Sequence, residues 1–539
     1  MPALSRPLLL LLALACLGLP AAADHHDRAA SDSKAKASKQ GDESGDGGKD
    51  KSDKNEDTDD EQPELSITTG SVTIDGEEVE YYATAGKLPQ KDDSLDEKAQ
   101  LFFVAYTKGK PPKDSDKHAE DGGPDASRPI TFCFNGGPGS ASLWLHLGML
   151  GPKRVKLPDD ASFPPPPYEV TDNPYSLLDV TDLVFIDPVS TGYSRAAEGE
   201  EKAQFHGLEE DIESVGRFIH DYTTRFGRWR SPKFLLGESY GGIRSGGLSH
   251  LLQDRYRMYL NGVVLVSAVL DFSTLDFAAN NDLPYILFLP GYAVAAWEQK
   301  ALDDELLGKS IEEINKLAEE FAYGDYADAL LQGASMPEEK REEVAERFAE
   351  LTGLSKGYVE DNRLRIPMWR FSKELLRDRN LMIGRYDSRY AMPGRQPGGD
   401  SMEYDPSGVS LTGIFSGAMH AYLREGLEYE DERVYEVFGS VRPWNYKPYV
   451  NSYVTTAEDL RRAMTENPAL RVFAACGYHD LATPAFAMEH TRDHALDRQD
   501  LLDRFDIRHY FGGHMMYVYE PSLKELRKDL VKWYEEATP

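Results

Sequence analysis

Apolar and polar positions along the chain predict a layered α/β protein. Short unbroken apolar runs alternate with stretches of helical spacing, and two shorter runs from Ser66 to Ala83 flank the turn Asp75-Gly76. Unbroken runs are typical of strands buried on both faces, as in parallel sheets covered by helices. We therefore expect a hairpin at 66–83, a mostly parallel central sheet, and further strands at Leu101–Tyr106, Ile130–Phe134, Leu183–Ile186, Phe234–Leu236, Val263–Ser267 and Val472–Ala475.

Between about Leu275 and Pro443 the pattern changes to charged, amphipathic helices with few strand-like runs. We expect helices at Ser310–Leu331 and Pro337–Leu351, and Ser310 and Glu313 have capping-box spacing. The pattern predicts a helical lid insertion at about 275–443 within one catalytic α/β domain at 63–539. The last strand and helix of that domain return after Trp444.

The first residues have the pattern of a targeting signal. Arg6, the apolar stretch Leu8–Leu19 and Ala21-Ala22-Ala23 predict a signal peptide at 1–23 and a secreted protein, periplasmic or extracellular. Cys16 follows Ala13-Leu14-Ala15, so lipoprotein processing is the alternative. Residues 24–62 contain no Val, Ile, Leu, Met, aromatic or Cys residue, which predicts a disordered charged linker.

Composition excludes several classes of protein. The 539 residues have a net charge of −32, which disfavours nucleic acid as a partner because phosphate binding needs a basic face. Three cysteines exclude a disulfide scaffold, and one long apolar run excludes a multi-span membrane protein. Gly308-Lys309-Ser310 lacks the first glycine of a phosphate loop, because Asp303 stands there. We expect no cofactor, no metal, no nucleic acid and no membrane span.

One motif predicts a nucleophile. Gly237-Glu238-Ser239-Tyr240-Gly241 matches GxSxG between the strand Phe234–Leu236 and a helical run at Ile243–Leu252. Small residues allow a sharp turn that exposes the Ser239 hydroxyl. The helix N-terminus and the following backbone N–H then face a developing oxyanion.

A nucleophilic serine needs a base and a group that orients the base. His514 lies in a glycine-flanked loop, and Asp480 follows the strand Val472–Ala475. The order Ser239, Asp480, His514 along the chain is that of α/β-hydrolases. Taken singly, His514 is also explained as an ordinary loop histidine and Asp480 as a residue that caps a turn. Asn135-Gly136-Gly137-Pro138-Gly139 allows a close backbone approach that suits an oxyanion hole.

Six ordered motifs resemble those of the serine carboxypeptidases, and the bacterial members above all. They are NGGPGS at 135–140, NPYS at 173–176, DPVSTGYS at 187–194, GESYGG at 237–242, GYHDLATP at 477–484 and GGHMMY at 512–517. The resemblance spans roughly residues 65–537. It implies an α/β-hydrolase fold and release of C-terminal amino acids from peptides through an acyl-enzyme.

The resemblance also implies a role for each motif residue. It makes Ser239 the nucleophile, His514 the general base and acid, and Asp480 the group that orients His514. The backbone N–H groups of Gly137 and Tyr240 would form the oxyanion hole. Asn135 and Glu238 would bind the terminal carboxylate of the peptide. An Asn amide offers two N–H donors and a protonated Glu offers one O–H, so both suit a carboxylate.

Two positions depart from the family pattern. Met149 stands where many members have a further carboxylate-binding Glu, and Ser140 stands at the position of a disulfide cysteine in eukaryotic members. Cys133 and Cys476 lie in predicted core strands, so we expect buried free thiols.

Three functions remain at this point. The first is a secreted serine carboxypeptidase that acts on peptide substrates. The second, favoured by Met149, is an esterase, amidase or acyltransferase of the same fold. The third is a catalytically silent binding protein, which the complete set of triad and oxyanion residues disfavours. The sequence leaves the oligomeric state open.

Overall fold

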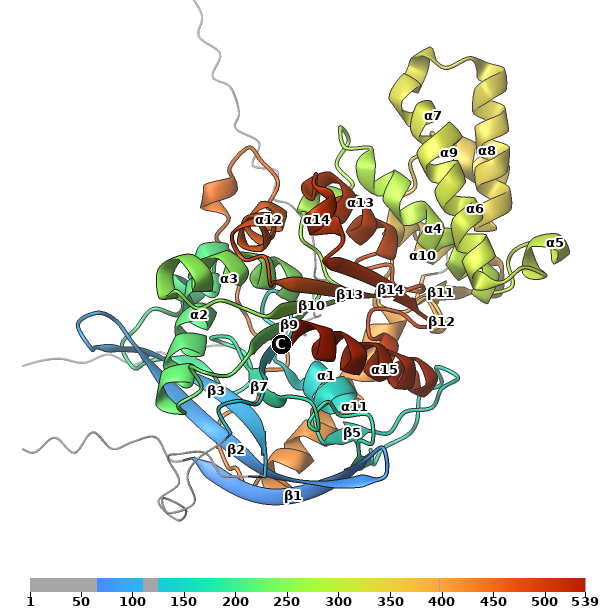
Figure 1. Cartoon of the computed structure of the whole chain (residues 1–539). Coiled ribbons are helices and arrows are strands. Elements are labelled where there is room, and N and C mark those ends of the chain that lie inside the picture. The colour runs from blue at the N-terminus through green and yellow to red at the C-terminus, as the bar shows by residue number, and fades with distance from the viewer. Residues whose placement is uncertain (1–64, 110–124, 397, 539) are drawn as a thin grey trace, which may run out of the picture. The chain divides into compact units, whose positions relative to one another are not determined.

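The computed structural model describes residues 65–109, 125–396 and 398–538 (Figure 1). The predicted signal peptide, the charged linker and Cys16 lie outside the described residues. The strands are β1 Ser66–Ile74, β2 Glu77–Lys91, β3 Glu97–Lys108, β4 Ile130–Phe134, β5 Lys153–Val155, β6 Val170–Asp172, β7 Asp182–Ile186, β8 Arg195–Ala196, β9 Lys233–Glu238, β10 Gly262–Val266, β11 Leu381–Ile383, β12 Ala391–Pro393, β13 Arg471–Gly477 and β14 Phe505–Tyr510.

The central sheet has the order β1-β2-β3-β7-β4-β9-β10-β13-β14, and β8 pairs with β3. From β7 to β14 in this order, each strand is parallel to the next. The pairs β1–β2, β2–β3 and β3–β7 are antiparallel. This mostly parallel sheet confirms the predicted α/β-hydrolase fold. All of the strands expected from apolar runs are present, and the hairpin turns at Asp75-Gly76.

Helices cover both faces of the sheet (Figure 1). One core contains apolar residues of α11 (Pro406–Glu425) and α15 (Glu520–Ala537), among them Phe415 and Leu526. The other contains residues of α2 (Leu208–Arg225), α3 (Gly241–Tyr256) and α12 (Ala457–Glu466), among them Phe218 and Leu248. Within β4, Phe132 belongs to one core and Cys133 to the other, so each face of the strand is buried. This explains why the strand is an unbroken apolar run. Cys133 and Cys476 are buried free thiols, as predicted.

The α-helices can be followed in chain order by their labels and colour in Figure 1. The α-helices are α1 Leu143–Leu145, α2 Leu208–Arg225, α3 Gly241–Tyr256, α4 Leu283–Glu298, α5 Asp304–Leu307, α6 Ile311–Phe321, α7 Ala327–Gln332, α8 Glu338–Thr352, α9 Lys356–Asp361, α10 Met368–Glu374, α11 Pro406–Glu425, α12 Ala457–Glu466, α13 Ala485–Ala495, α14 Gln499–Leu502 and α15 Glu520–Ala537.

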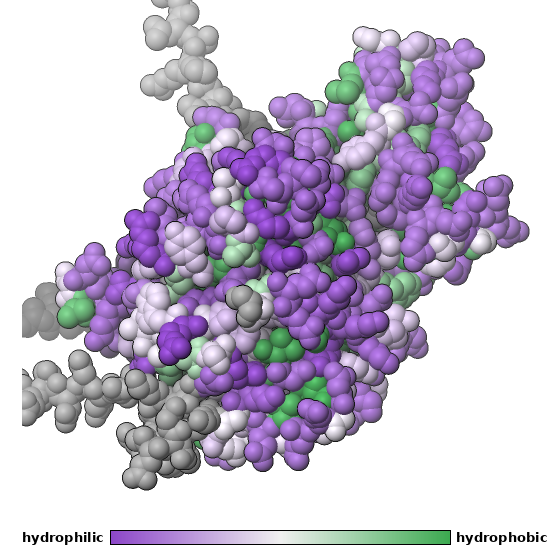
Figure 2. All heavy atoms as spheres, viewed as in Figure 1, coloured by the Kyte–Doolittle hydropathy of each residue, from purple (hydrophilic) through white to green (hydrophobic). Residues whose placement is uncertain are grey.

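The segment from α4 to α10 has a hydrophobic core of its own, which includes Leu481 and Phe486 from the region after β13. Its outward side chains are largely hydrophilic in the view of Figure 2. Ser310 and Glu313 form the predicted capping box at the start of α6. The single helix expected at Ser310–Leu331 is interrupted, because Gly324 has a non-helical backbone (φ −93°, ψ −112°) between α6 and α7.

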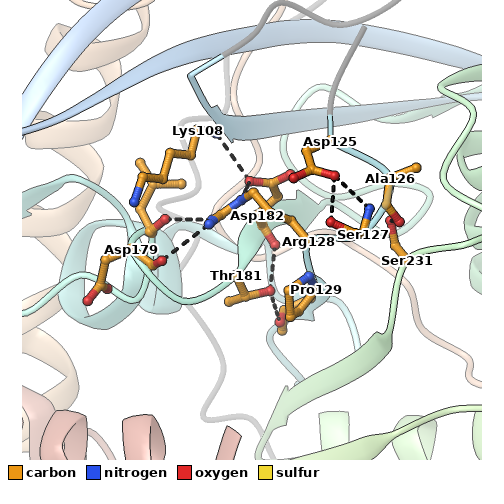
Figure 3. Close-up of polar contacts among 12 residues, drawn as sticks. Lys108, Asp125, Ala126, Ser127, Arg128, Pro129, Asp179, Thr181, Asp182 and Ser231 are labelled. Atoms are coloured by element: carbon orange, nitrogen blue, oxygen red, sulfur yellow. Dashed lines mark hydrogen bonds and ion pairs between the residues drawn. The ribbon is translucent and has the colours of Figure 1, made fainter. Parts of the chain in front are cut away.

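A buried ion pair lies at the amino end of the parallel strands. Asp182 begins β7, and its carboxylate accepts a hydrogen bond from Arg228 Nη1 at 2.6 Å. It also accepts from Arg128 Nε and from the Lys108 N–H, each at 3.1 Å (Figure 3). The side chains of Asp182 and Arg228 are each 2% exposed. Removing one partner of such a pair leaves an uncompensated buried charge.

We therefore expect Asp182→Ala to lower the free energy of unfolding by about 3–5 kcal/mol, measured by urea denaturation. Asp172→Ala is the control, because Asp172 is 60% exposed in its pair with Lys153. Exposed pairs contribute about 0–1 kcal/mol. Equal effects of the two substitutions would show that burial of the Asp182 pair does not govern its contribution.

Candidate active site

Four of the candidate residues follow the carboxyl ends of parallel strands in the central sheet. Loops at this edge of a parallel sheet form the crevice in which α/β proteins bind ligands. The strand and the residue that follows it are β4 with Asn135, β9 with Ser239, β13 with Asp480 and β14 with His514.

The Ser239 turn is sharp. β9 ends at Glu238 and α3 begins at Gly241, and Ser239 between them has φ +62°, in the left-handed region that is strained for a side chain. Its N–H donates to the Val266 carbonyl at 3.1 Å, and its own carbonyl accepts from Val269 N–H at 3.2 Å. The end of β10 therefore holds the turn from both sides. Ser239 is half-buried, and its hydroxyl has no hydrogen-bond partner within the described ranges.

His514 and Asp480 are in direct contact. His514 Nδ1 lies 2.8 Å from Asp480 Oδ2, and both side chains are buried. The other carboxylate oxygen, Oδ1, accepts backbone N–H bonds from Ala482 at 2.7 Å and Thr483 at 3.0 Å. Burial alone would lower the pKa of His514, but the Asp480 carboxylate outweighs it and the pKa is raised.

Thr483 connects this pair to the Ser239 turn. Its hydroxyl lies 2.8 Å from Asp480 Oδ2 and 3.1 Å from His514 Nδ1, and it donates to the Ser267 carbonyl at 2.7 Å. Ser267 is adjacent to Val266, which binds the Ser239 N–H. Three neighbouring loops are thereby held in one hydrogen-bonded group.

The glycine-rich loop after β4 packs against the same turn. A Cβ on Gly136 would lie 2.4 Å from the Tyr240 backbone nitrogen, so only glycine permits this approach. Gly137 has φ +107°, another conformation that favours glycine. The N–H groups of Gly137 and Tyr240 have no acceptor within the described part of the chain. They are available to an oxygen atom of a ligand.

Glu238 and Asn135 form a buried polar site beside Ser239. Burial raises the pKa of Glu238 to about 7, although His514, Tyr517 and Asn135 each oppose the rise. Asn135 Oδ1 accepts the Leu145 N–H at 3.2 Å, which orients its amide. Asn135 Nδ2 is buried and has no partner at hydrogen-bond geometry among the described residues. The site therefore offers amide donors and a carboxyl that is readily protonated near neutral pH.

Residues outside the predicted set also contact the site. The Tyr517 hydroxyl donates to Glu238 Oε2 at 2.6 Å, and the Tyr386 carbonyl accepts the His514 N–H at 2.5 Å. Thr483 and Tyr517 lie in the motifs at 477–484 and 512–517, but nothing in the sequence indicated that their side chains contact Asp480 and Glu238. Tyr386 comes from the segment 275–443, where no sequence signal pointed to the site.

Met149 and Ser140, the two positions that depart from the family pattern, each take part in a hydrogen bond within the fold. Met149 is buried in a one-turn π-helix at His146–Leu150, and its carbonyl accepts from Asn173 Nδ2 at 2.9 Å. The Ser140 hydroxyl accepts the Trp144 Nε1–H at 3.0 Å.

The described residues contain neither a cluster suited to a metal ion nor a helix suited to a membrane. No group of three or more His, Cys, Asp or Glu residues is arranged to hold a metal ion there. Across the same residues, no helix is both long and apolar enough to span a bilayer.

Comparison with known proteins relates the chain to one family. Residues 93–346 match the model of the family described as serine carboxypeptidase. The chain is 29% identical over 169 residues to the pheromone-processing carboxypeptidase KEX1 of Saccharomyces cerevisiae, covering 29% of this chain and 20% of that protein. It is 27% identical over 165 residues to the lysosomal protective protein of Mus musculus, covering 30% and 32%. The chain thus spans about a fifth to a third of the length of these relatives.

Solved structures that align with the chain are distant from it in sequence. The proline iminopeptidase of Mycobacterium smegmatis aligns with a TM-score of 0.33 and 13% identity, over 84% of this chain and 98% of that one. A lipase in its open form aligns with a TM-score of 0.32 and 12% identity, over 84% and 99%.

Proposed function

We propose that the chain, whose residues 93–346 match the model of the serine carboxypeptidase family, removes C-terminal amino acids from peptides through an acyl-enzyme. One observation carries the proposal most directly. Beside the half-buried Ser239 lie the buried carboxyl of Glu238 and the unpaired amide of Asn135. A peptide carboxylate supplies the acceptor oxygens that this pair of donors lacks.

The proposed chemistry assigns one step to each group of the site. Ser239 Oγ attacks the last peptide carbonyl while its proton passes to His514 Nε2, and Asp480 at 2.8 Å stabilises the imidazolium. The N–H groups of Gly137 and Tyr240 bind the tetrahedral oxyanion. The C–N bond then breaks, His514 returns the proton to the leaving amino group, and an acyl-enzyme remains on Ser239. Water activated by His514 hydrolyses the ester and releases the shortened peptide.

Glu238 has a distinct role in the proposal. The terminal carboxylate of a bound peptide and an ionised Glu238 would repel one another, so Glu238 binds the peptide as the protonated acid. A pKa of about 7 in the free protein means that the acid form is present at and below neutral pH. Binding of the carboxylate raises that pKa further.

The pH dependence of kcat/KM tests this role. For a peptide, the rate constant should fall as pH rises through about 7, because Glu238 then loses the proton that it donates. At low pH it should also fall, because the raised pKa of His514 keeps the base protonated. The C-terminal amide of the same peptide has no carboxylate, so its rate should rise with deprotonation of His514 and stay high.

Glu238→Gln is the matched variant. It keeps an N–H donor at every pH, so the alkaline fall with the peptide should disappear. The amide profile should keep its shape and move to lower pH, because the Glu238 carboxylate no longer raises the pKa of His514. Superimposable profiles for peptide and amide in the unmodified enzyme would remove Glu238 from carboxylate recognition. The ester or amide hydrolase, which the buried Met149 favours, would then be the better proposal.

Secretion belongs to the same proposal. It rests on the apolar pattern of residues 8–19. Acid-favoured peptide trimming does not depend on it.

A further inference from the structure

We propose that Tyr517 is a positioning residue for Glu238, holding one carboxyl oxygen so that the acid proton stays on the oxygen that meets the peptide terminus. This inference rests on the proposed function and names the group that orients its specificity site. Tyr517 is fully buried, and its hydroxyl is engaged with Glu238.

The hydrogen bond between the two side chains has a defined direction. The Tyr517 hydroxyl donates to Glu238 Oε2 at 2.6 Å. Burial and the neighbouring Glu238 carboxylate raise the pKa of Tyr517 well above its ordinary value, so the hydroxyl keeps its proton throughout the working range. With Oε2 engaged as an acceptor, the proton of the neutral acid lies on Oε1. The hydroxyl therefore orients the donor of the carboxyl group.

Glycine at position 148 allows the Tyr517 ring to reach this place. A Cβ on Gly148 would lie 2.5 Å from Tyr517 Cε2 and 3.3 Å from Phe415 Cε1. Any side chain at position 148 would displace the tyrosine ring or the phenylalanine behind it. The next residue, Met149, is buried in the same hydrophobic core as Tyr517 and carries no carboxyl group. The partner of Glu238 Oε2 is the Tyr517 phenol.

The phenol partner determines how Glu238 titrates. Two carboxyl groups in contact share one proton and titrate as a pair. A tyrosine does not ionise in the same range, so Glu238 should titrate as a single acid. The other titratable groups that face Glu238 are His514, whose positive charge lowers its pKa, and Asp480, whose negative charge raises it weakly.

Tyr517→Phe removes the hydroxyl and keeps the ring. Glu238 then loses a hydrogen bond that favours its ionised form, so its pKa rises. The alkaline fall of kcat/KM for the peptide should move up by on the order of one pH unit. At acid pH the peptide KM should rise about tenfold, because the proton is no longer directed. Both constants for the C-terminal amide should stay within about twofold of the unmodified enzyme.

Tyr519→Phe is the matched control, because Tyr519 lies two residues further on and packs its ring against Phe511. It should change neither profile. In the Glu238→Gln background, Tyr517→Phe should no longer move the alkaline limb. Gly148→Ala provides a second route, since it displaces the ring and keeps the hydroxyl, and it should reproduce the shift.

The outcomes separate this inference from the proposed function. If the unmodified enzyme releases amino acids from peptides but Tyr517→Phe leaves the alkaline limb in place, Tyr517 does not position Glu238. The same holds if peptide and amide lose activity equally in Tyr517→Phe, since that marks a structural defect. If the unmodified enzyme releases no amino acid from any peptide, the proposed function itself fails.

Discussion

Replacing Ser239 with alanine should reduce kcat for peptide hydrolysis by about 10⁴–10⁶-fold, because the variant lacks the oxygen on which the acyl-enzyme forms. The side chain is half-buried and its hydroxyl has no hydrogen-bond partner among the described residues, so its loss leaves no buried group unpaired. The left-handed φ of +62° suits alanine no worse than serine. The melting temperature should therefore change little.

Release of free amino acids, together with labelling by a serine-directed fluorophosphonate, measures the effect. Ser249→Ala is the control on the same helix, because the Ser249 hydroxyl donates only to the Gly246 carbonyl at 2.6 Å. It should keep activity and labelling. Retention of more than a few per cent of activity by Ser239→Ala would assign the nucleophile to another residue.

Asp480→Asn should lower kcat by about 10⁴-fold at neutral pH with the loop still folded. The two backbone N–H groups of Ala482 and Thr483 donate to Oδ1 at 2.7 and 3.0 Å, so the asparagine oxygen takes that place. Its NH₂ group then faces His514 Nδ1. The imidazole must present Nδ1 as an acceptor and carry its proton on Nε2, where it is unable to accept the proton of Ser239.

The measurement is kcat against pH, with melting temperature as a check of folding. Removing the Asp480 carboxylate also removes the interaction that raises the pKa of His514, so the remaining activity should titrate at lower pH. Asp529→Asn is the control, because Asp529 binds the Tyr510 hydroxyl at 2.8 Å and belongs to α15. Activity of Asp480→Asn within tenfold of the unmodified enzyme would contradict the role of Asp480.

The local sequence pattern is sufficient to predict a strand where both faces of the strand are buried, because burial then determines its residue types. β4 and β10 are recognisable because every side chain in them is buried. β14 was not predicted as a strand, since Asp506 and Arg508 interrupt its apolar residues. It is the last strand in the sheet order, so one of its edges pairs with β13 and the other has no neighbouring strand. An edge strand tolerates polar residues that a central strand excludes.

Motif order was enough to select Ser239, Asp480 and His514 as candidates, because a strand followed by a sharp turn is a local property. The oxyanion loop was also recognisable, since close backbone approach requires glycine at positions such as Gly136. These inferences needed only residue type and spacing along the chain.

Tertiary structure decided the electrostatics of the site and the contacts that cross the fold. The pKa of Glu238 rises to about 7 because of burial, which no spacing in the sequence reports. Tyr517 reaches Glu238 across 279 positions of sequence, through space left by Gly148. A charge responds to the atoms that replace water around it, and those atoms are assembled only when distant segments pack together.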